Sequence, residues 1–175
     1  MYEVELLVKL KIPDVTALTA ANALRRRLGY ESTLASLQRA DYYRLGLQAP
    51  DAAAAHALAV ELAEKTNLFV NPNKHVYELR EGGRVPEAVR NGHHVVQVLV
   101  TDPHDGSAEG ALAALQGRLG YGQRVQSLLK GTLWTLELVC DSREQALEMA
   151  RDIAITRARD RGLLMNPHFQ EVEIW

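Results

Sequence analysis

The residues with chemically reactive side chains are few and scattered. The 175-residue chain has six histidines and one cysteine. His93 and His94 are adjacent in a predicted strand, so their side chains would point to opposite faces and would not bind one metal ion together. Cys140 has no basic neighbour in the sequence, and a lone cysteine excludes an internal disulfide and a CxxC site. We therefore predict no catalytic residue, no cofactor and no metal site.

Two arginine clusters are candidate anion or protein contacts. Arg25-Arg26-Arg27 and the segment 157–161 lie near the ends of predicted helices, where cations complement the helix dipole. Capping and solvation are the favoured interpretation of both, and a phosphate or protein contact is the alternative for the first. Tyr42-Tyr43 and Trp134 lie in predicted strands, as base-stacking aromatics do in RNA-binding domains. The glycine-aromatic pattern is missing and the net charge is −2, so we expect sheet packing and no nucleic-acid partner.

Composition places the chain among ordinary globular proteins. Hydrophobic residues make up 47% and charged residues 24% of the sequence, which fits one domain or two small ones. There is no apolar run of the length that spans a bilayer, and the acidic start lacks the features of a signal peptide. We therefore expect a cytoplasmic protein with no membrane partner.

Short motifs recur in the same order along the chain. Arg27-Leu28-Gly29-Tyr30 recurs as 118–121, and Asn71-Pro72 recurs as Asn166-Pro167. The first strand pattern, 4–8, matches 96–100. A nearly constant offset through several matches indicates duplication. We predict two homologous units, 1–80 and 93–175, joined by a linker at 81–92.

The same elements are expected in each unit. A strand is followed by a helix that ends at Gly29, then a strand hairpin, a second helix and a last strand. The hairpin tips are placed at Ala40-Asp41 and at Lys130-Gly131. The order βαββαβ is that of a ferredoxin-like unit. The predicted fold class is α+β, with two tandem ferredoxin-like units and antiparallel sheets.

These motifs resemble those of one family. Each unit is similar to PurS, the small subunit of phosphoribosylformylglycinamidine synthase, and the likeness covers both units. The matching residues are Leu28-Gly29-Tyr30, Leu119-Gly120-Tyr121, the segments 68–72 and 163–167 that end in Asn-Pro, the acidic Glu78 and Glu173, and Asp102-Pro103 followed by Gly106. The chain departs from the family at Ile12-Pro13-Asp14 and at the two hairpin tips, where the family carries glycine followed by lysine.

The resemblance implies a subunit without chemistry of its own. The parent complex converts formylglycinamide ribonucleotide to its amidine with glutamine and ATP, and PurS resembles an assembly factor between the synthetase and glutaminase subunits. Single-unit PurS is expected to dimerise, so this tandem chain would be a pseudo-dimer, with further homo-oligomers open. Strand edges, helix faces and turns would form the interface. The candidate interface residues are Asn71, Pro72, Lys130, Gly131, Asn166 and Pro167.

Two other functions stay open. Paired ferredoxin-like units of the ACT type bind small regulatory molecules at their interface, but this is an analogy of fold alone. A small dimeric α+β enzyme would need a polar cluster in a pocket, around His56, His75 or His168.

Overall fold

The computed structural model describes residues 1–81, 88–159 and 161–175. Within these residues it confirms the α+β class, with four α-helices and one antiparallel sheet of seven strands. Half of the predicted linker, residues 82–87, and Asp160 lie outside the described residues. The elements are β1 (Tyr2–Leu10), α1 (Val15–Leu28), β2 (Leu34–Leu47), α2 (Ala52–Lys65), β3 (His75–Glu81), β4 (Ala88–Arg90), β5 (His93–Thr101), α3 (Ser107–Gln116), the 3-10 turn η1 (Gly122–Arg124), β6 (Val125–Leu138), α4 (Arg143–Ala154) and β7 (Glu171–Ile174).

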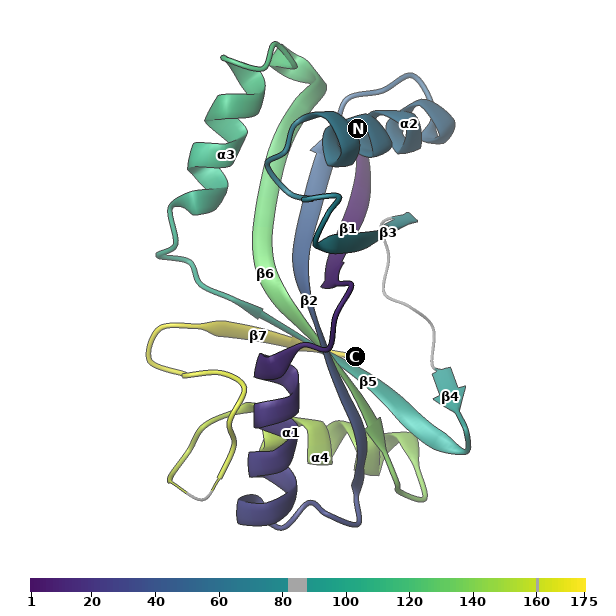
Figure 1. Cartoon of the computed structure of the whole chain (residues 1–175), viewed down its shortest axis with the longest axis vertical. Coiled ribbons are helices and arrows are strands. Elements are labelled where there is room, and N and C mark those ends of the chain that lie inside the picture. Colours follow the sequence, from purple (N-terminus) through teal and green to yellow (C-terminus); the bar gives the residue numbers. More distant parts are fainter. Residues whose placement is uncertain (82–87, 160) are drawn as a thin grey trace. The chain divides into compact units, whose positions relative to one another are not determined.

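Both predicted hairpins are wrong, because each range forms one long strand. β2 continues through Ala40-Asp41 and β6 through Lys130-Gly131, and Figure 1 draws each as a single arrow. A two-residue hairpin needs residues at positive φ. Gly131 is not among the glycines with positive φ, and Asp41 stays in the ladder opposite Val8. Each half of the sequence therefore has the order βαβαβ.

The chain forms two compact units that do not follow the halves of the sequence. Unit 1 contains Met1–Ile12, the described residues of Ala40–Gly83, and His104–Gly131. Unit 2 contains Pro13–Arg39, the described residues of Arg84–Pro103, and Thr132–Trp175. Each unit therefore takes segments from both halves. The division into 1–80 and 93–175 remains a prediction about sequence repeats and does not describe the compact units.

The apolar core of unit 1 forms where one face of β1 meets two helices. Val4, Leu6 and Val8 alternate along β1 and pack with the buried face of α2 and with Leu115 of α3. Burying a leucine side chain fully contributes about 1.5–3 kcal/mol. Asp51 starts α2 by accepting a hydrogen bond from the Ala54 amide at 2.7 Å. α3, which follows β5 in the chain, thus serves the core built on β1.

Unit 2 has the reciprocal arrangement. Its core contains the alternating valines of β5, with buried side chains of α4 and with Ala17 and Leu24 of α1. Ser142 starts α4 by accepting a hydrogen bond from the Gln145 amide at 3.1 Å. α1, which follows β1, serves the core built on β5. The two halves are therefore interleaved through their first helices.

The strands are hydrogen-bonded in the order β3-β1-β2-β6-β5-β4, and β7 also pairs with β5. β4 is a short strand that the linker prediction did not include. None of the described helices is long and apolar enough to cross a membrane.

Candidate functional site

The repeated Leu-Gly-Tyr motif follows the first helix of each half and makes one equivalent hydrogen bond back to it. α1 ends directly before Gly29, whereas α3 ends earlier, with Gly117 as its cap. Gly29 and Gly120 have φ of 81° and 73°, a conformation that favours glycine. The next residue, Tyr30 or Tyr121, donates its amide to the carbonyl six residues back, at 3.2 Å and 2.9 Å. The motif therefore has a structural role in both halves.

The tyrosine side chains of this motif also have matching surroundings. The Tyr121 hydroxyl donates to Glu61 of α2 at 3.4 Å, and the Arg124 guanidinium lies 5.0 Å from the ring centroid. Burial raises the pKa of Tyr30, and the carboxylate of Asp152 on α4 raises it further, while Arg161 opposes this. Each tyrosine thus meets an acidic residue of the other half's second helix.

The two Asn-Pro segments form the same turn. The amides of Asn73 and His168 each donate to the side-chain oxygen of the asparagine two residues earlier, at 3.0 Å in both turns. The asparagine amides donate to a side chain four residues on, to His75 Nδ1 at 3.1 Å and to Gln170 Oε1 at 2.8 Å. The asparagine side chains therefore hold the turns.

Both turns are exposed at their prolines. Asn71 and Pro72 lie on the surface of unit 1, and Asn166 and Pro167 on the surface of unit 2. Phe169, just beyond the second turn, is 62% exposed. A well-ordered, exposed turn of this kind can form part of a protein interface.

Lys130 and Gly131 lie within β6 and not at a hairpin tip. The Lys130 ammonium lies 3.3 Å from Asp105 and donates to the Ser107 hydroxyl at 2.9 Å, just at the start of α3. Hydrogen bonds from the Ser107 hydroxyl and amide, and then from Lys130, hold the pKa of Asp105 below its usual range. The pair is exposed, so its ammonium is accessible to a partner.

The other half carries an equivalent pair that sequence reasoning missed. Arg39 of β2 donates to Asp14 at 2.9 Å, and Asp14 accepts the amides of Thr16 and Ala17 at the start of α1. Burial alone would raise the pKa of Asp14, but Arg39 and the two amides outweigh it and the pKa is lowered. An acidic residue before the first helix and a cation at the middle of the long strand are the signal that could have revealed this repeat.

The histidines and the cysteine do not form a reactive group. His56, His104 and His168 are exposed, and His75 accepts a hydrogen bond within its turn. Among the described residues, no group of three or more His, Cys, Asp or Glu side chains is arranged to hold a metal ion. Burial raises the pKa of the half-buried Cys140 thiol, which disfavours the thiolate.

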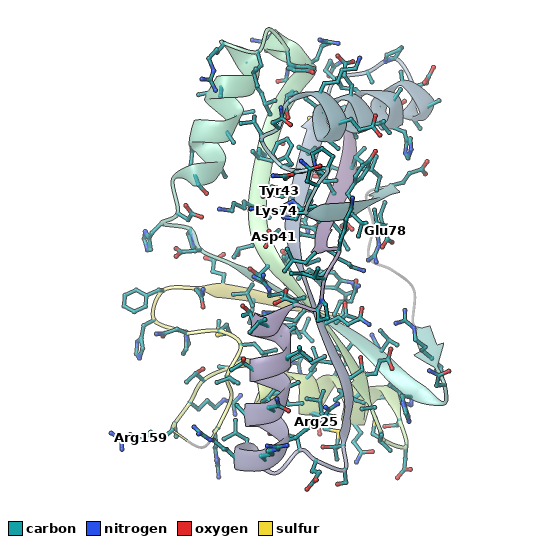
Figure 2. All side chains as sticks on the ribbon, in the orientation of Figure 1. Arg25, Asp41, Tyr43, Lys74, Glu78 and Arg159 are labelled. Carbon is teal, nitrogen blue, oxygen red and sulfur yellow. The ribbon has the colours of Figure 1, made fainter. Side chains whose placement is uncertain are left out.

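The arginine clusters divide into structural and exposed members. Arg25 donates to the carbonyls of Leu34 and Ala35, so it joins α1 to β2. Arg26 and Arg27 line a surface cavity of about 310 Å³ together with Thr19, Asn22 and Ala23. In the second cluster, Arg157 lies 3.6 Å from Asp152, and Arg159 projects from the surface in Figure 2.

The aromatic residues of the long strands are packed in the fold, as expected. Trp134 belongs to the core of unit 2, and the Tyr43 ring lies 4.8 Å from that of Phe69. Tyr42 is fully buried and donates to Glu5 at 2.8 Å, while it accepts from Arg44 at 3.1 Å. Burial and the Glu5 carboxylate raise the pKa of Tyr42.

Charged residues occupy paired positions on β1, β2 and β3 next to the hydrogen bonds of Tyr42. Glu5 lies between Arg44 on β2 and Arg80 on β3 in the ladder register. Arg80 donates to Glu78 at 2.7 Å, and this contact holds the pKa of Glu78 below its usual range. Glu78 is labelled on β3 in Figure 2, beyond Lys74 of the Asn71-Pro72 turn. The exposed turn and β3, whose residues are in part exposed and in part half-buried, together form the segment 71–81, which we call the β3 segment.

The structure places the predicted interface residues in three separate segments. Of the predicted interface residues, Asn71 and Pro72 open the β3 segment, Lys130 and Gly131 lie in β6, and the second turn lies in unit 2. Comparison with known proteins adds no identification: no family model matches the chain, and no curated protein matches its sequence significantly.

Proposed function

We propose that the chain is a non-catalytic, PurS-like subunit that bridges a synthetase and a glutaminase in the phosphoribosylformylglycinamidine synthase of purine biosynthesis. The observation that carries the proposal is the repetition of two local features: the hydrogen bond from the tyrosine of Leu-Gly-Tyr back to the preceding helix, and the Asn-Pro turn. The motifs behind the PurS resemblance therefore recur with their geometry, and the turns remain exposed for partner contacts.

We infer further that each compact unit is an interleaved ferredoxin-like unit. In unit 1, the order β3-β1-β2-β6 with helices α2 and α3 supports this, because a βαββαβ unit would place its fourth, first, third and second strands in that order. The first helix and second strand of that unit come from the other half of the chain. A single chain would then supply the two ferredoxin-like units that a pair of separate PurS subunits supplies.

Reconstitution with the partners tests the proposal. The full chain is mixed with the synthetase and glutaminase of the same organism, with glutamine and ADP-Mg, and separated by size-exclusion chromatography. Each fraction is assayed for glutamine-dependent amidine formation. We expect co-elution, with activity that is lost when the chain is omitted.

Surface variants give the test a local control. Lys74→Glu changes an exposed residue of the β3 segment, whereas His56→Glu changes an exposed residue of α2 outside it. We expect the first to weaken co-elution and the second to leave it intact. Independent elution of the chain, with full activity of the other two proteins alone, would contradict the proposed function.

A further inference from the structure

We propose that β3 is a pairing edge at which two copies of this chain join, antiparallel, about a two-fold axis at Leu79. Among the described residues, β1 is the only strand that pairs with β3, so the other edge of β3 is available to a further strand. This goes beyond the proposed function and does not depend on it, because it concerns the chain by itself.

The hydrogen bonds to β1 determine which backbone groups of β3 point outward. Lys11 donates its amide to the Lys74 carbonyl at 2.9 Å, just before the β1–β3 ladder begins, and the residue pairing continues in the same register. Hydrogen-bonded pairs alternate with pairs that are not hydrogen-bonded in an antiparallel ladder. The hydrogen-bonded pairs are therefore Lys9 with Val76, Leu7 with Glu78, and Glu5 with Arg80.

The remaining residues of β3 direct their amides and carbonyls away from β1. These are His75, Tyr77, Leu79 and Glu81. In a two-fold pairing about Leu79, the two Leu79 residues form a hydrogen-bonded pair, and Tyr77 of each copy pairs with Glu81 of the other. All of these outward groups except those of His75 would then be satisfied by the second copy.

The charges on β3 select this register. With the axis at Leu79, Glu78 of each copy stands opposite Arg80 of the other in a pair that is not hydrogen-bonded, where side chains lie closest. Because Arg80 also contacts Glu78 within its own strand, the four charges alternate in sign around the axis. An axis at Glu78 would oppose two glutamates, and an axis at Arg80 would oppose two arginines, both of which are unfavourable.

The equivalent strand of unit 2 lacks this complementarity. Gln97 and Trp175 exchange hydrogen bonds of 2.8 Å and 3.0 Å, so Val172 and Ile174 are the outward residues of β7. An axis at Ile174 would place Glu173 opposite Trp175, and an axis at Val172 would place it opposite Glu171 of the other copy. The comparison assigns the second copy to β3 and not to β7.

Exposure along β3 agrees with a role in pairing. Val76 is 49% exposed on the face that also carries Glu78 and Arg80. Tyr77 and Leu79 pack against the core of unit 1 from the other face, which holds the strand in place. A second copy would extend the sheet of unit 1 across the axis.

Sedimentation velocity of the full chain over a range of concentrations tests the proposal, with one matched pair of variants. Glu81 has an outward amide and an exposed side chain, so Glu81→Pro removes an intermolecular donor and leaves the β1 ladder intact. Glu81→Ala removes the same charge and keeps the amide. We expect a dimer in the wild type and in Glu81→Ala, and a dissociation constant about tenfold higher or more in Glu81→Pro.

Charge exchange checks the register. Arg80→Glu would oppose like charges and is expected to abolish the dimer, whereas the double variant Glu78→Arg with Arg80→Glu is expected to recover it. Thermal unfolding confirms that each variant is folded, and the Glu81 pair decides alone if the charge variants do not fold. A wild-type chain that stays monomeric at 100-fold above the working concentration, or a Glu81→Pro dimer of unchanged affinity, would overturn the proposal. Protection of the Leu79 amide from hydrogen exchange only after the synthetase is added would assign this edge to that protein instead.

Discussion

The pairs Arg39–Asp14 and Lys130–Asp105 occupy equivalent places but are built differently. In unit 2 a guanidinium lies 2.9 Å from a carboxylate whose side chain is 16% exposed. In unit 1 an ammonium lies 3.3 Å from a carboxylate whose side chain is 43% exposed. An arginine in a well-fixed contact rigidifies the helix start, whereas an exposed lysine contributes little to stability and remains available to a partner. The ion pair at this position therefore stabilises the helix start in unit 2, whereas in unit 1 it lies exposed at the surface.

The largest loss of stability should be about the same in the two units, because a buried leucine occupies the matching position in each core. Leu24 and Leu115 are fully buried at the matching helix ends. We expect Leu24→Ala and Leu115→Ala each to lower the free energy of unfolding by about 3 kcal/mol, measured by urea denaturation. Leu18→Ala, at an exposed position of α1, is the control and should change stability by less than about 0.5 kcal/mol. Strongly unequal losses would show that the cores are not equivalent.

Replacing the aspartate at the start of the first helix should destabilise the protein more in unit 2 than in unit 1. Asp14→Ala removes two amide partners and the Arg39 contact, so we expect a loss of about 1–2 kcal/mol in the free energy of unfolding. Asp105→Ala should cause a smaller loss, because its contacts are exposed. Equilibrium urea curves of both variants measure the difference, and equal losses would break the comparison.

The pH dependence of stability should also depend on Arg39. The folded-state pKa of Asp14 is below its ordinary value of 3.8. The ionised carboxylate therefore stabilises the fold fully above that value, and this stabilisation is lost as the pH falls through the folded-state pKa. We expect the stability difference between wild type and Arg39→Met to shrink between pH 6 and pH 3. Urea midpoints at both pH values test this, and a constant difference would contradict the assignment.

The smallest effect on stability is expected at Lys130. Lys130→Ala should leave the urea midpoint almost unchanged, because exposed ion pairs contribute little. If this ammonium meets a partner, the same variant should weaken co-elution with the synthetase and glutaminase. Arg39→Ala, at the matching position of unit 2, should instead lower stability and leave assembly of the folded chain unaffected.

Local sequence signals identified the helices and the Asn-Pro turns, but neither the two long strands nor how the halves combine. The αL glycine at Gly29 and both Asn-Pro turns follow from residue types and short spacings. Whether Ala40-Asp41 turns or stays extended depends on strands far away in the sequence, which local patterns do not encode.

The charged residues around Tyr42 could not be recognised from the sequence, whereas the Asn71-Pro72 turn could. Asn71 and Pro72 were found because asparagine and proline have strong local preferences. Glu5, Arg44 and Arg80 were missed because an alternating charged position in a strand normally indicates a solvated face. Glu5 is instead buried, and only its partners on two neighbouring strands explain why a charge is placed there.

The interleaving of the halves has a consequence for synthesis on the ribosome. Val4, Leu6 and Val8 emerge early, but their core also needs α3 and the first part of β6, which end near Gly131. At about 5–20 residues per second, the first half would wait several seconds with its apolar strand face incompletely covered. The order of translation thus exposes to chaperones and proteases a surface that the finished protein never shows.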